Sequence, residues 1–131
     1  MDNETLYSDD PVQVYLTEVS KVPPLSRDEE IRCVQHVRAG DEQAEAAERR
    51  LVEANLPLVV SIAERYRNLG SVHMLDLIEQ GNEGLLQAVQ AFRDSSEDEF
   101  ATYATPHIEL AIAEAARTTP ERPLLTHRRY Q

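Results

Sequence analysis

Hydrophobic residues recur mainly every three or four positions along this chain, as expected for helices that bury one side. Over about residues 11–20 the apolar positions are Val12, Tyr15, Leu16 and Val19. The stripe that we expect to be most buried consists of Leu58, Val59, Ile62, Ala63 and Tyr66. Over about residues 74–92, a rotation of about 100° per residue places five apolar residues on one side: Leu75, Ile78, Leu85, Val89 and Phe92. The pattern therefore predicts an all-α protein.

Capping signals set the boundaries of the first two predicted helices. Asp10 precedes Pro11, which is the arrangement of an N-cap followed by proline in the first turn. Ser26-Arg-Asp-Glu29 has the pattern of a capping box, in which the serine and glutamate side chains satisfy reciprocal backbone N–H groups. Gly40 supplies the left-handed residue that commonly ends a helix. We therefore expect helices over 11–20 and 27–39.

The middle of the chain contains one ambiguous break. We expect Asp41 to cap a helix that runs to about Ala54. At Asn55-Leu-Pro57 the chain either continues this helix with a kink or starts a new helix with Pro57 in its first turn. Gly70 is expected to end the helix that follows.

Glycine and proline shape the last two predicted helices. A helix is predicted over about 74–92 although it contains Gly81 and Gly84, each of which costs about 1 kcal/mol relative to alanine. Two such costs in one helix indicate close approach of another backbone. Thr105-Pro106 has the pattern of an N-cap and first helical residue, so we expect the last helix over about 106–117. A short turn or helix over 99–104 should precede it.

Length and composition fit a single domain. With 131 residues and 41% hydrophobic content, the chain can build one modest core. We expect a compact bundle of about five to six helices over residues 11–117. Residues 1–10 are expected to form a disordered acidic lead, and residues 118–131 a flexible basic tail.

Acidic residues dominate most of the chain. The formal net charge is −11, and residues 1–116 contain 23 of the 24 acidic residues but only 9 of the 13 basic ones. The remaining basic residues are Arg117, Arg122, Arg128 and Arg129. An acidic body repels nucleic acid and attracts basic protein surfaces.

Catalytic and metal-binding motifs are absent from the sequence. There is no glycine-rich phosphate loop, no nucleophile motif and no Glu-x-x-His pair, so we expect neither an enzyme nor a bound cofactor. Cys33 and His36 lie three positions apart, but no second pair has ligand spacing, so we expect no metal site. A single cysteine, no signal peptide and no long apolar run predict a cytoplasmic protein without a membrane partner.

The most distinctive sequence is Asp76-Leu-Ile-Glu-Gln-Gly-Asn-Glu-Gly-Leu-Leu-Gln-Ala-Val89, followed by Phe100-Ala-Thr-Tyr-Ala-Thr105. Three earlier stretches accompany it: Asp10-Pro-Val-Gln-Val-Tyr-Leu16, Ser26-Arg-Asp-Glu-Glu30 and Glu53-Ala-Asn-Leu-Pro-Leu-Val-Val-Ser-Ile-Ala63. Their order and spacing closely resemble regions 1.2, 2.1 and 2.2 of the bacterial RNA polymerase sigma factors of the sigma-70 family. The resemblance implies a helical bundle like sigma factor domain 2.

The resemblance also implies a partner for the 74–92 helix. In the family, one strip of this helix docks on the clamp helices of the largest subunit of core RNA polymerase. The matching residues are Leu75, Asp76, Glu79, Gln80, Asn82, Glu83 and Leu86. Carboxylates and amides on a rigid helix can accept charge-assisted hydrogen bonds from arginines, and Leu86 would supply an apolar anchor. From periodicity alone, the same strip is an ordinary solvated helix face.

The segment that opens promoter DNA in the family is altered in this chain. The residues that match positions stacking on and cupping a flipped base are Phe100, Thr102 and Tyr103. Pro106 and His107 replace two tryptophans, and residues 94–116 contain six acids and no Lys or Arg. Because phosphate contacts dominate affinity for nucleic acid, we expect weakened or lost recognition of the promoter −10 element. Alternatively, the two aromatics are packing residues.

Three functional hypotheses follow from the sequence. The first is a sigma-factor-like protein of transcription initiation that binds core RNA polymerase and binds promoter DNA weakly or not at all. The second is a decoy that binds an anti-sigma factor and so releases a genuine sigma factor. The third is a weak but genuine sigma factor that melts promoter DNA with Phe100 and Tyr103.

Overall fold

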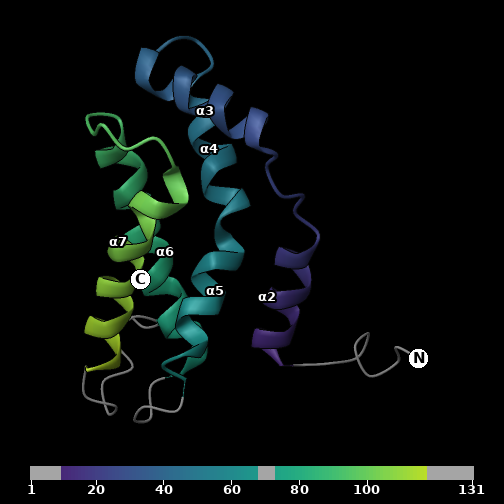
Figure 1. Cartoon of the computed structure of the whole chain (residues 1–131). Helices are drawn as coiled ribbons and strands as arrows, with labels where there is room; N and C mark the ends of the chain where they lie inside the picture. The colour runs from purple at the N-terminus through teal and green to yellow at the C-terminus, as the bar shows by residue number, and fades with distance from the viewer. Residues whose placement is uncertain (1–9, 68–72, 118–131) are drawn as a thin grey trace.

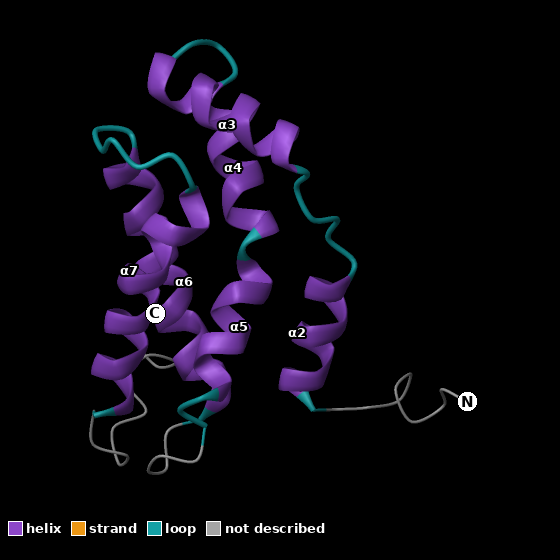
Figure 2. Cartoon of the chain, viewed as in Figure 1, coloured by secondary structure: helices purple, strands orange, loops and turns teal. Residues whose placement is uncertain are grey.

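The computed structural model describes residues 10–67 and 73–117, and all regular secondary structure in these ranges is helical (Figures 1 and 2). The helices are α2 (Pro11–Ser20), α3 (Arg27–Ala39), α4 (Ala44–Ala54), α5 (Leu56–Glu64), α6 (Met74–Phe92) and α7 (Phe100–Ala116). The predicted all-α fold is confirmed. The predictions for the acidic lead before residue 10, for Gly70 and for the tail after residue 117 fall outside the described residues.

The helices pack around the hairpin formed by α6 and α7. These two helices make the most extensive contact in the fold, and α4 and α5 follow each other nearly end to end beside them (Figure 1). α3 crosses the end of α4 near the turn between α6 and α7, while α2 lies on the other side of α5 (Figure 1). This arrangement leaves one side of α6 uncovered by other helices along part of its length.

The first two helices begin and end where their caps predict. The Asp10 carboxylate accepts a hydrogen bond from the Val12 N–H at 3.0 Å. In the capping box, Ser26 Oγ accepts from the Glu29 N–H at 3.1 Å, and Glu29 Oε1 accepts from the Ser26 N–H at 2.9 Å. Gly40 ends α3 with φ of 63°, a left-handed conformation that favours glycine. Both predicted helices are confirmed.

A single residue separates α4 from α5. Asn55 has φ of −107° and ψ of 7°, and α5 restarts at Leu56 with Pro57 in its first turn. Of the two predicted alternatives, the structure has the restart. Asp41 does not cap α4 directly: its carboxylate accepts from the Gln43 N–H at 2.9 Å, and α4 begins at Ala44. The prediction of Asp41 as the helix cap was wrong because aspartate bonded to the N–H two residues on stabilises a turn.

Both glycines of α6 lie at close helix contacts, as predicted. A Cβ atom on Gly81 would lie 2.6 Å from Val59 Cγ1 of α5 and 2.8 Å from Ile112 Cδ1 of α7. A Cβ atom on Gly84 would lie 2.6 Å from the carbonyl oxygen of His107. These distances are shorter than van der Waals contact, so the absence of side chains lets α6 approach both neighbours closely.

The last helix differs from its prediction. α7 is one continuous helix with Pro106 in its interior, whereas the sequence predicted a start at residue 106. Pro106 lacks an N–H for the carbonyl of Thr102, yet the helix continues past this position. The Phe100 N–H donates to Glu30 Oε2 of α3 at 3.0 Å, so a distant carboxylate caps the helix at residue 100. No local sequence pattern reveals this contact.

The core is one cluster of apolar side chains centred on α6 and its neighbours. The buried residues of α6 are Met74, Leu77, Ile78, Gly81, Gly84, Leu85, Ala88, Val89 and Phe92. Leu75 was predicted in the core but is half-buried at its margin, whereas Met74, Leu77 and Ala88 were missed. Because α4, α5 and α7 all pack on α6, its buried face is wider than one helical stripe.

The predicted stripe on α5 is buried at its centre and half-buried at its ends. Val59, Ile62 and Ala63 have no exposed surface, and Leu58 and Tyr66 are half-buried.

Within residues 10–67 and 73–117, no helix combines the length and apolar character needed to cross a membrane.

Candidate functional site

The strip predicted on α6 forms one continuous surface. Six of its residues are half-buried, and Leu86 is 46% exposed. Positions three or four apart on a helix are neighbours, so Leu75, Glu79, Asn82, Glu83 and Leu86 share one side of α6. Asp76 and Gln80 extend this surface outward. Together these seven residues are called the α6 strip.

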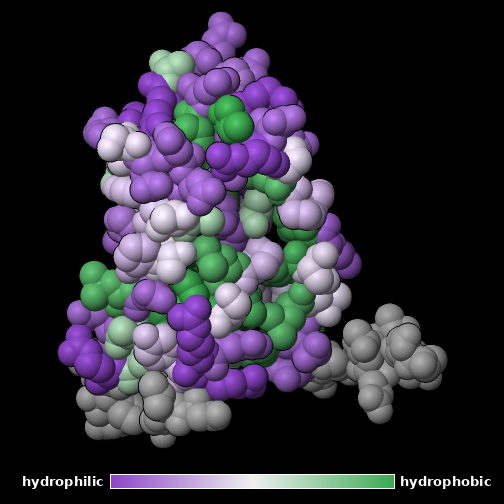
Figure 3. Space-filling model, viewed as in Figure 1, coloured by the Kyte–Doolittle hydropathy of each residue, from purple (hydrophilic) through white to green (hydrophobic). Residues whose placement is uncertain are grey.

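One edge of the α6 strip borders α2. Asn82 Nδ2 donates a hydrogen bond to the Tyr15 hydroxyl at 3.3 Å. Asn82 Oδ1 is buried and has no hydrogen-bond partner among the described residues. A buried acceptor without a donor costs free energy. Hydrophobic residues surround a hollow beside α2 in the space-filling view (Figure 3).

The other edge of the α6 strip borders α4. Leu86 is one wall of a groove of about 240 Å³ between the two helices. The groove is lined by Glu45, Glu48, Arg49, Val52, Leu86, Val89 and Gln90. Arg93, at the end of α6, pairs with Glu48 of α4 at 2.7 Å. The exposed leucine therefore lies beside a shallow apolar groove with charged edges.

Phe100 lies in the core rather than on the surface. Its side chain has no exposed area, and its ring packs edge to face on Phe92 with centroids 5.2 Å apart. A base could stack on Phe100 only if the ring left the core. In this structure Phe100 is therefore a packing residue of the core.

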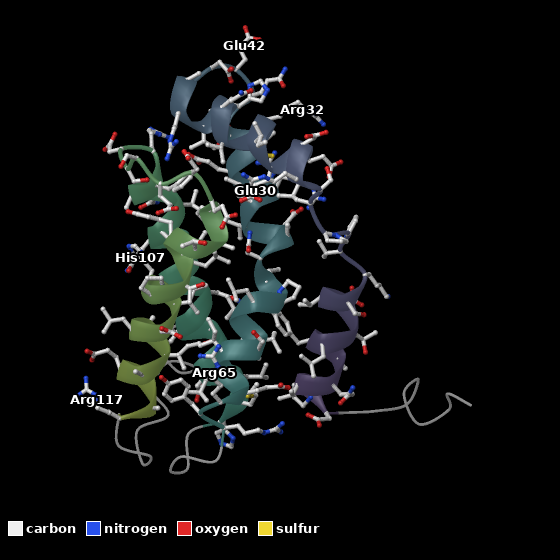
Figure 4. All side chains as sticks on the ribbon, in the orientation of Figure 1. Glu30, Arg32, Glu42, Arg65, His107 and Arg117 are labelled. Atoms are coloured by element: carbon white, nitrogen blue, oxygen red, sulfur yellow. The ribbon has the colours of Figure 1, made fainter. Side chains whose placement is uncertain are left out.

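Thr102 and Tyr103, unlike Phe100, reach the surface. Thr102 is exposed, and its hydroxyl donates to Glu99 Oε1 at 2.8 Å. The half-buried Tyr103 ring lies 5.4 Å from Phe92 and 4.9 Å from the His107 ring, centroid to centroid. His107 is visible on α7 in Figure 4. The structure thus separates the predicted trio into buried Phe100, exposed Thr102 and half-buried Tyr103, which packs against the margin of the core.

Three acids at or near α7 are paired with arginines. Glu109 lies 3.0 Å from Arg65, the residue that follows α5, and Glu99 lies 3.5 Å from Arg27 of α3. Glu114 pairs with Arg117 at 2.8 Å. Arg65 and Arg117 are labelled in Figure 4. The count of acids along residues 94–116 therefore overstated the negative charge of this face, because arginines from other segments lie beside it.

The turn between α6 and α7 is held by α3. The Arg38 guanidinium lies 4.4 Å from the centroid of the Phe92 ring and donates to Ser95 Oγ at 3.2 Å and to the carbonyl of Glu97. Glu30 of the same helix caps α7 (Figure 4). Sequence reasoning gave neither residue a role because their contacts span about sixty to seventy positions.

Cys33 and His36 line a groove of about 390 Å³ between α3 and α4. Burial raises the pKa of the Cys33 thiol, which favours its protonated form. The hydrogen bond from His36 to Asp41, at 2.8 Å, holds the pKa of the Asp41 carboxyl below its usual value. Among the residues described, no group of three or more His, Cys, Asp or Glu side chains is placed to hold a metal ion.

The described residues define an all-α protein in which the α6 strip is a partly exposed surface of mixed polar and apolar residues. Residues 51–119 match the family model Sigma-70 region 2, and residues 10–43 match Sigma-70 factor, region 1.2. The chain therefore belongs to the sigma-70 family, and the resemblance stated from its sequence is confirmed.

Curated relatives are similar in sequence to this chain over most of its length. It is 48% identical over 114 residues to RNA polymerase sigma factor SigA of Lactococcus lactis subsp. cremoris, covering 84% of this chain and 31% of the relative. SigA of a Bacillus species is 49% identical over 113 residues, which cover 83% of this chain and 29% of the relative. SigA of Clostridium acetobutylicum is 48% identical over 119 residues, which cover 88% of this chain and 30% of the relative. The chain spans about a third of the length of these relatives.

Proposed function

We propose that this chain acts in transcription initiation as a sigma-factor-like protein that binds core RNA polymerase through the α6 strip. The observation that carries the proposal is the strip itself: an accessible row of carboxylates, amides and leucines on a helix that close packing holds rigid. The match to region 2 and relatives named RNA polymerase sigma factor support it. The partner surface is the pair of clamp helices of the largest polymerase subunit.

The chemistry of the α6 strip suits a basic helical partner. Asp76, Glu79 and Glu83 supply carboxylates, which form strong charge-assisted hydrogen bonds with arginine. Leu86, beside the groove between α4 and α6, provides the apolar anchor that interface centres usually contain.

Recognition of the promoter −10 element is weakened or lost in this proposal. Phe100 is held in the core, which leaves only Thr102 and Tyr103 accessible to a base. Arginines beside α7 offset its acids but are themselves engaged by carboxylates. The six acids of residues 94–116 outnumber these three arginines, and a face with excess negative charge repels the phosphates whose contacts supply most of the affinity for nucleic acid.

Binding of the full chain to core RNA polymerase tests this proposal. We expect association at micromolar protein that Leu86→Glu abolishes, since the substitution places a charge at the apolar anchor. Val14→Glu is a matched control, because Val14 is 49% exposed on α2 and lies outside the α6 strip. No binding at micromolar protein, or equal loss in both variants, would reject the proposal.

A second candidate is a decoy for an anti-sigma factor, favoured by the net charge of −11. An acidic surface attracts a basic regulator as readily as basic clamp helices. Co-purification of a small helical regulator, with no polymerase subunits, would select this function. Recovery of core polymerase alone would exclude it.

A third candidate is a weak genuine sigma factor, favoured by the accessibility of Thr102 and Tyr103. It predicts binding to single-stranded −10 DNA that weakens steeply with salt and is reduced by Tyr103→Ala. Absence of such binding at low salt removes this candidate.

A further inference from the structure

The outer face of α7 combines an exposed leucine with charges of opposite sign at its two ends. Leu110 is 65% exposed, more than any other large hydrophobic residue in the described ranges. Glu99 precedes the first residue of the helix, and Arg117 follows the last. Pro106 is also exposed on this face. Nothing in the proposed polymerase contact uses these four residues.

The spacing of these residues is symmetric along the helix. Successive separations from Glu99 through Pro106 and Leu110 to Arg117 are seven, four and seven residues. At about 100° per residue, all four directions fall within about 40° of one another. The separations are therefore the same in both chain directions. Glu99 occupies the position that matches Arg117, and Pro106 the position that matches Leu110.

This symmetry makes the face complementary to a second copy of itself. Glu99 and Arg117 are each nine residues from Ile108. If a two-fold axis perpendicular to α7, at the level of Ile108, relates the two copies, their α7 helices are antiparallel. Each Arg117 then faces the Glu99 of the other copy. Leu110 then faces Pro106 of the other copy. A parallel pair would instead place like charges together.

The charged residues are available for such a contact. Arg117 and Glu114 have side chains 70% and 60% exposed, and those of Arg27 and Glu99 are 59% and 54% exposed. Exposed pairs of this kind contribute little to stability, so their members can be shared with a second chain at small cost. Figure 4 shows Arg117 at the far end of α7 from Glu30.

We propose that α7 forms an antiparallel, two-fold symmetric contact between two copies of this chain, with Leu110 seated on Pro106 and Arg117 paired with Glu99. A single helix pair buries little area, so the dimer is weak. Moderate salt is needed to screen repulsion between two chains of net charge −11. This contact does not rest on polymerase binding, because the α6 strip lies on another helix.

Sedimentation equilibrium of the full chain at moderate salt tests the contact. We expect a reversible monomer–dimer equilibrium that Leu110→Glu abolishes. Glu99→Arg and Arg117→Glu should each weaken the dimer by about tenfold, because each reverses attraction at both ends of the pair. The double variant that carries both reversals should recover most of the lost affinity.

Two results would overturn this contact. One is a chain that remains monomeric at all concentrations, which would leave the face to a different protein or to nucleic acid. The other is a double variant whose dimer is no tighter than that of either single variant. Circular dichroism must show in that case that all three variants are folded. Val14→Glu should dimerise like the unaltered chain, and clamp-helix binding by Leu110→Glu should be unchanged.

Discussion

Gly84 shows how one residue links the sequence of α6 to its packing. The two helical glycines predicted a close approach, but the sequence could not tell whether a neighbouring helix or an outside partner came close. In the structure the neighbour is α7, whose His107 carbonyl occupies the space that a Cβ atom would need. The glycines therefore serve internal packing, and only the neighbouring surface of α6 is left for a partner.

Gly84→Ala should destabilise the protein although alanine favours helices by about 1 kcal/mol. The new Cβ atom would lie 2.6 Å from a backbone oxygen, so α6 and α7 must separate at a net cost of about 1–3 kcal/mol. Urea unfolding followed by circular dichroism measures the change. Gln87→Ala, on the exposed side of α6, should alter stability by less than about 0.5 kcal/mol; a stabilised Gly84→Ala would contradict the packing.

Stability should fall in acid because two carboxyl groups have lowered pKa values. The Ser26 N–H lowers the pKa of Glu29 below its ordinary 4.5, and His36 lowers that of Asp41 below 3.8. The unfolded chain then binds protons first, so the free energy of unfolding decreases as pH falls through these values. Urea unfolding between about pH 5 and 3 should show a shallower pH dependence in Glu29→Gln. Identical slopes would contradict the role of the capping box.

At the level of elements, local signals predicted most boundaries and long-range contacts decided the rest. The caps of α2 and α3 lie within four residues of the groups that they satisfy, so the sequence reveals them. The start of α7 depends on Glu30, seventy positions away, and Pro106 misled the prediction because proline is common in first turns. At Asn55, where local chemistry had left two alternatives open, the structure has a new helix that starts at Leu56.

Pro106→Ala distinguishes the continuous helix from the predicted start at residue 106. In a helix interior, alanine restores a backbone donor and removes a steric clash. We therefore expect stabilisation by about 1–3 kcal/mol, measured as a higher midpoint of thermal unfolding. At the first position of a helix, where proline is favoured, the same change would be neutral or destabilising, and that result would contradict the observed α7.

At the scale of the whole molecule, the sequence predicted the fold class and the surface of α6 better than the charge of α7. Periodicity is enough to place the α6 strip on one side, since position along a helix fixes direction. The charge of α7 depends on Arg27 and Arg65, which come from α3 and from the end of α5. Phe100 was ambiguous for a similar reason: its burial depends on Phe92 across the hairpin.

The α6 strip is the surface through which we propose that the chain contacts the clamp helices. Asp76→Arg replaces a carboxylate of the strip with a cation, so it should weaken binding to basic helices by at least about tenfold. Glu42→Arg makes the same change of charge at the turn between α3 and α4, far from the start of α6 (Figures 1 and 4). It should reduce binding only slightly.

The most direct measurement is titration calorimetry of the full chain against a fragment carrying the clamp helices, at low and moderate salt. We expect saturable binding that Asp76→Arg weakens by at least about tenfold and that Glu42→Arg reduces only slightly, at both salt concentrations. Undiminished binding by Asp76→Arg, or no binding by the unaltered chain, would contradict the assignment of the α6 strip.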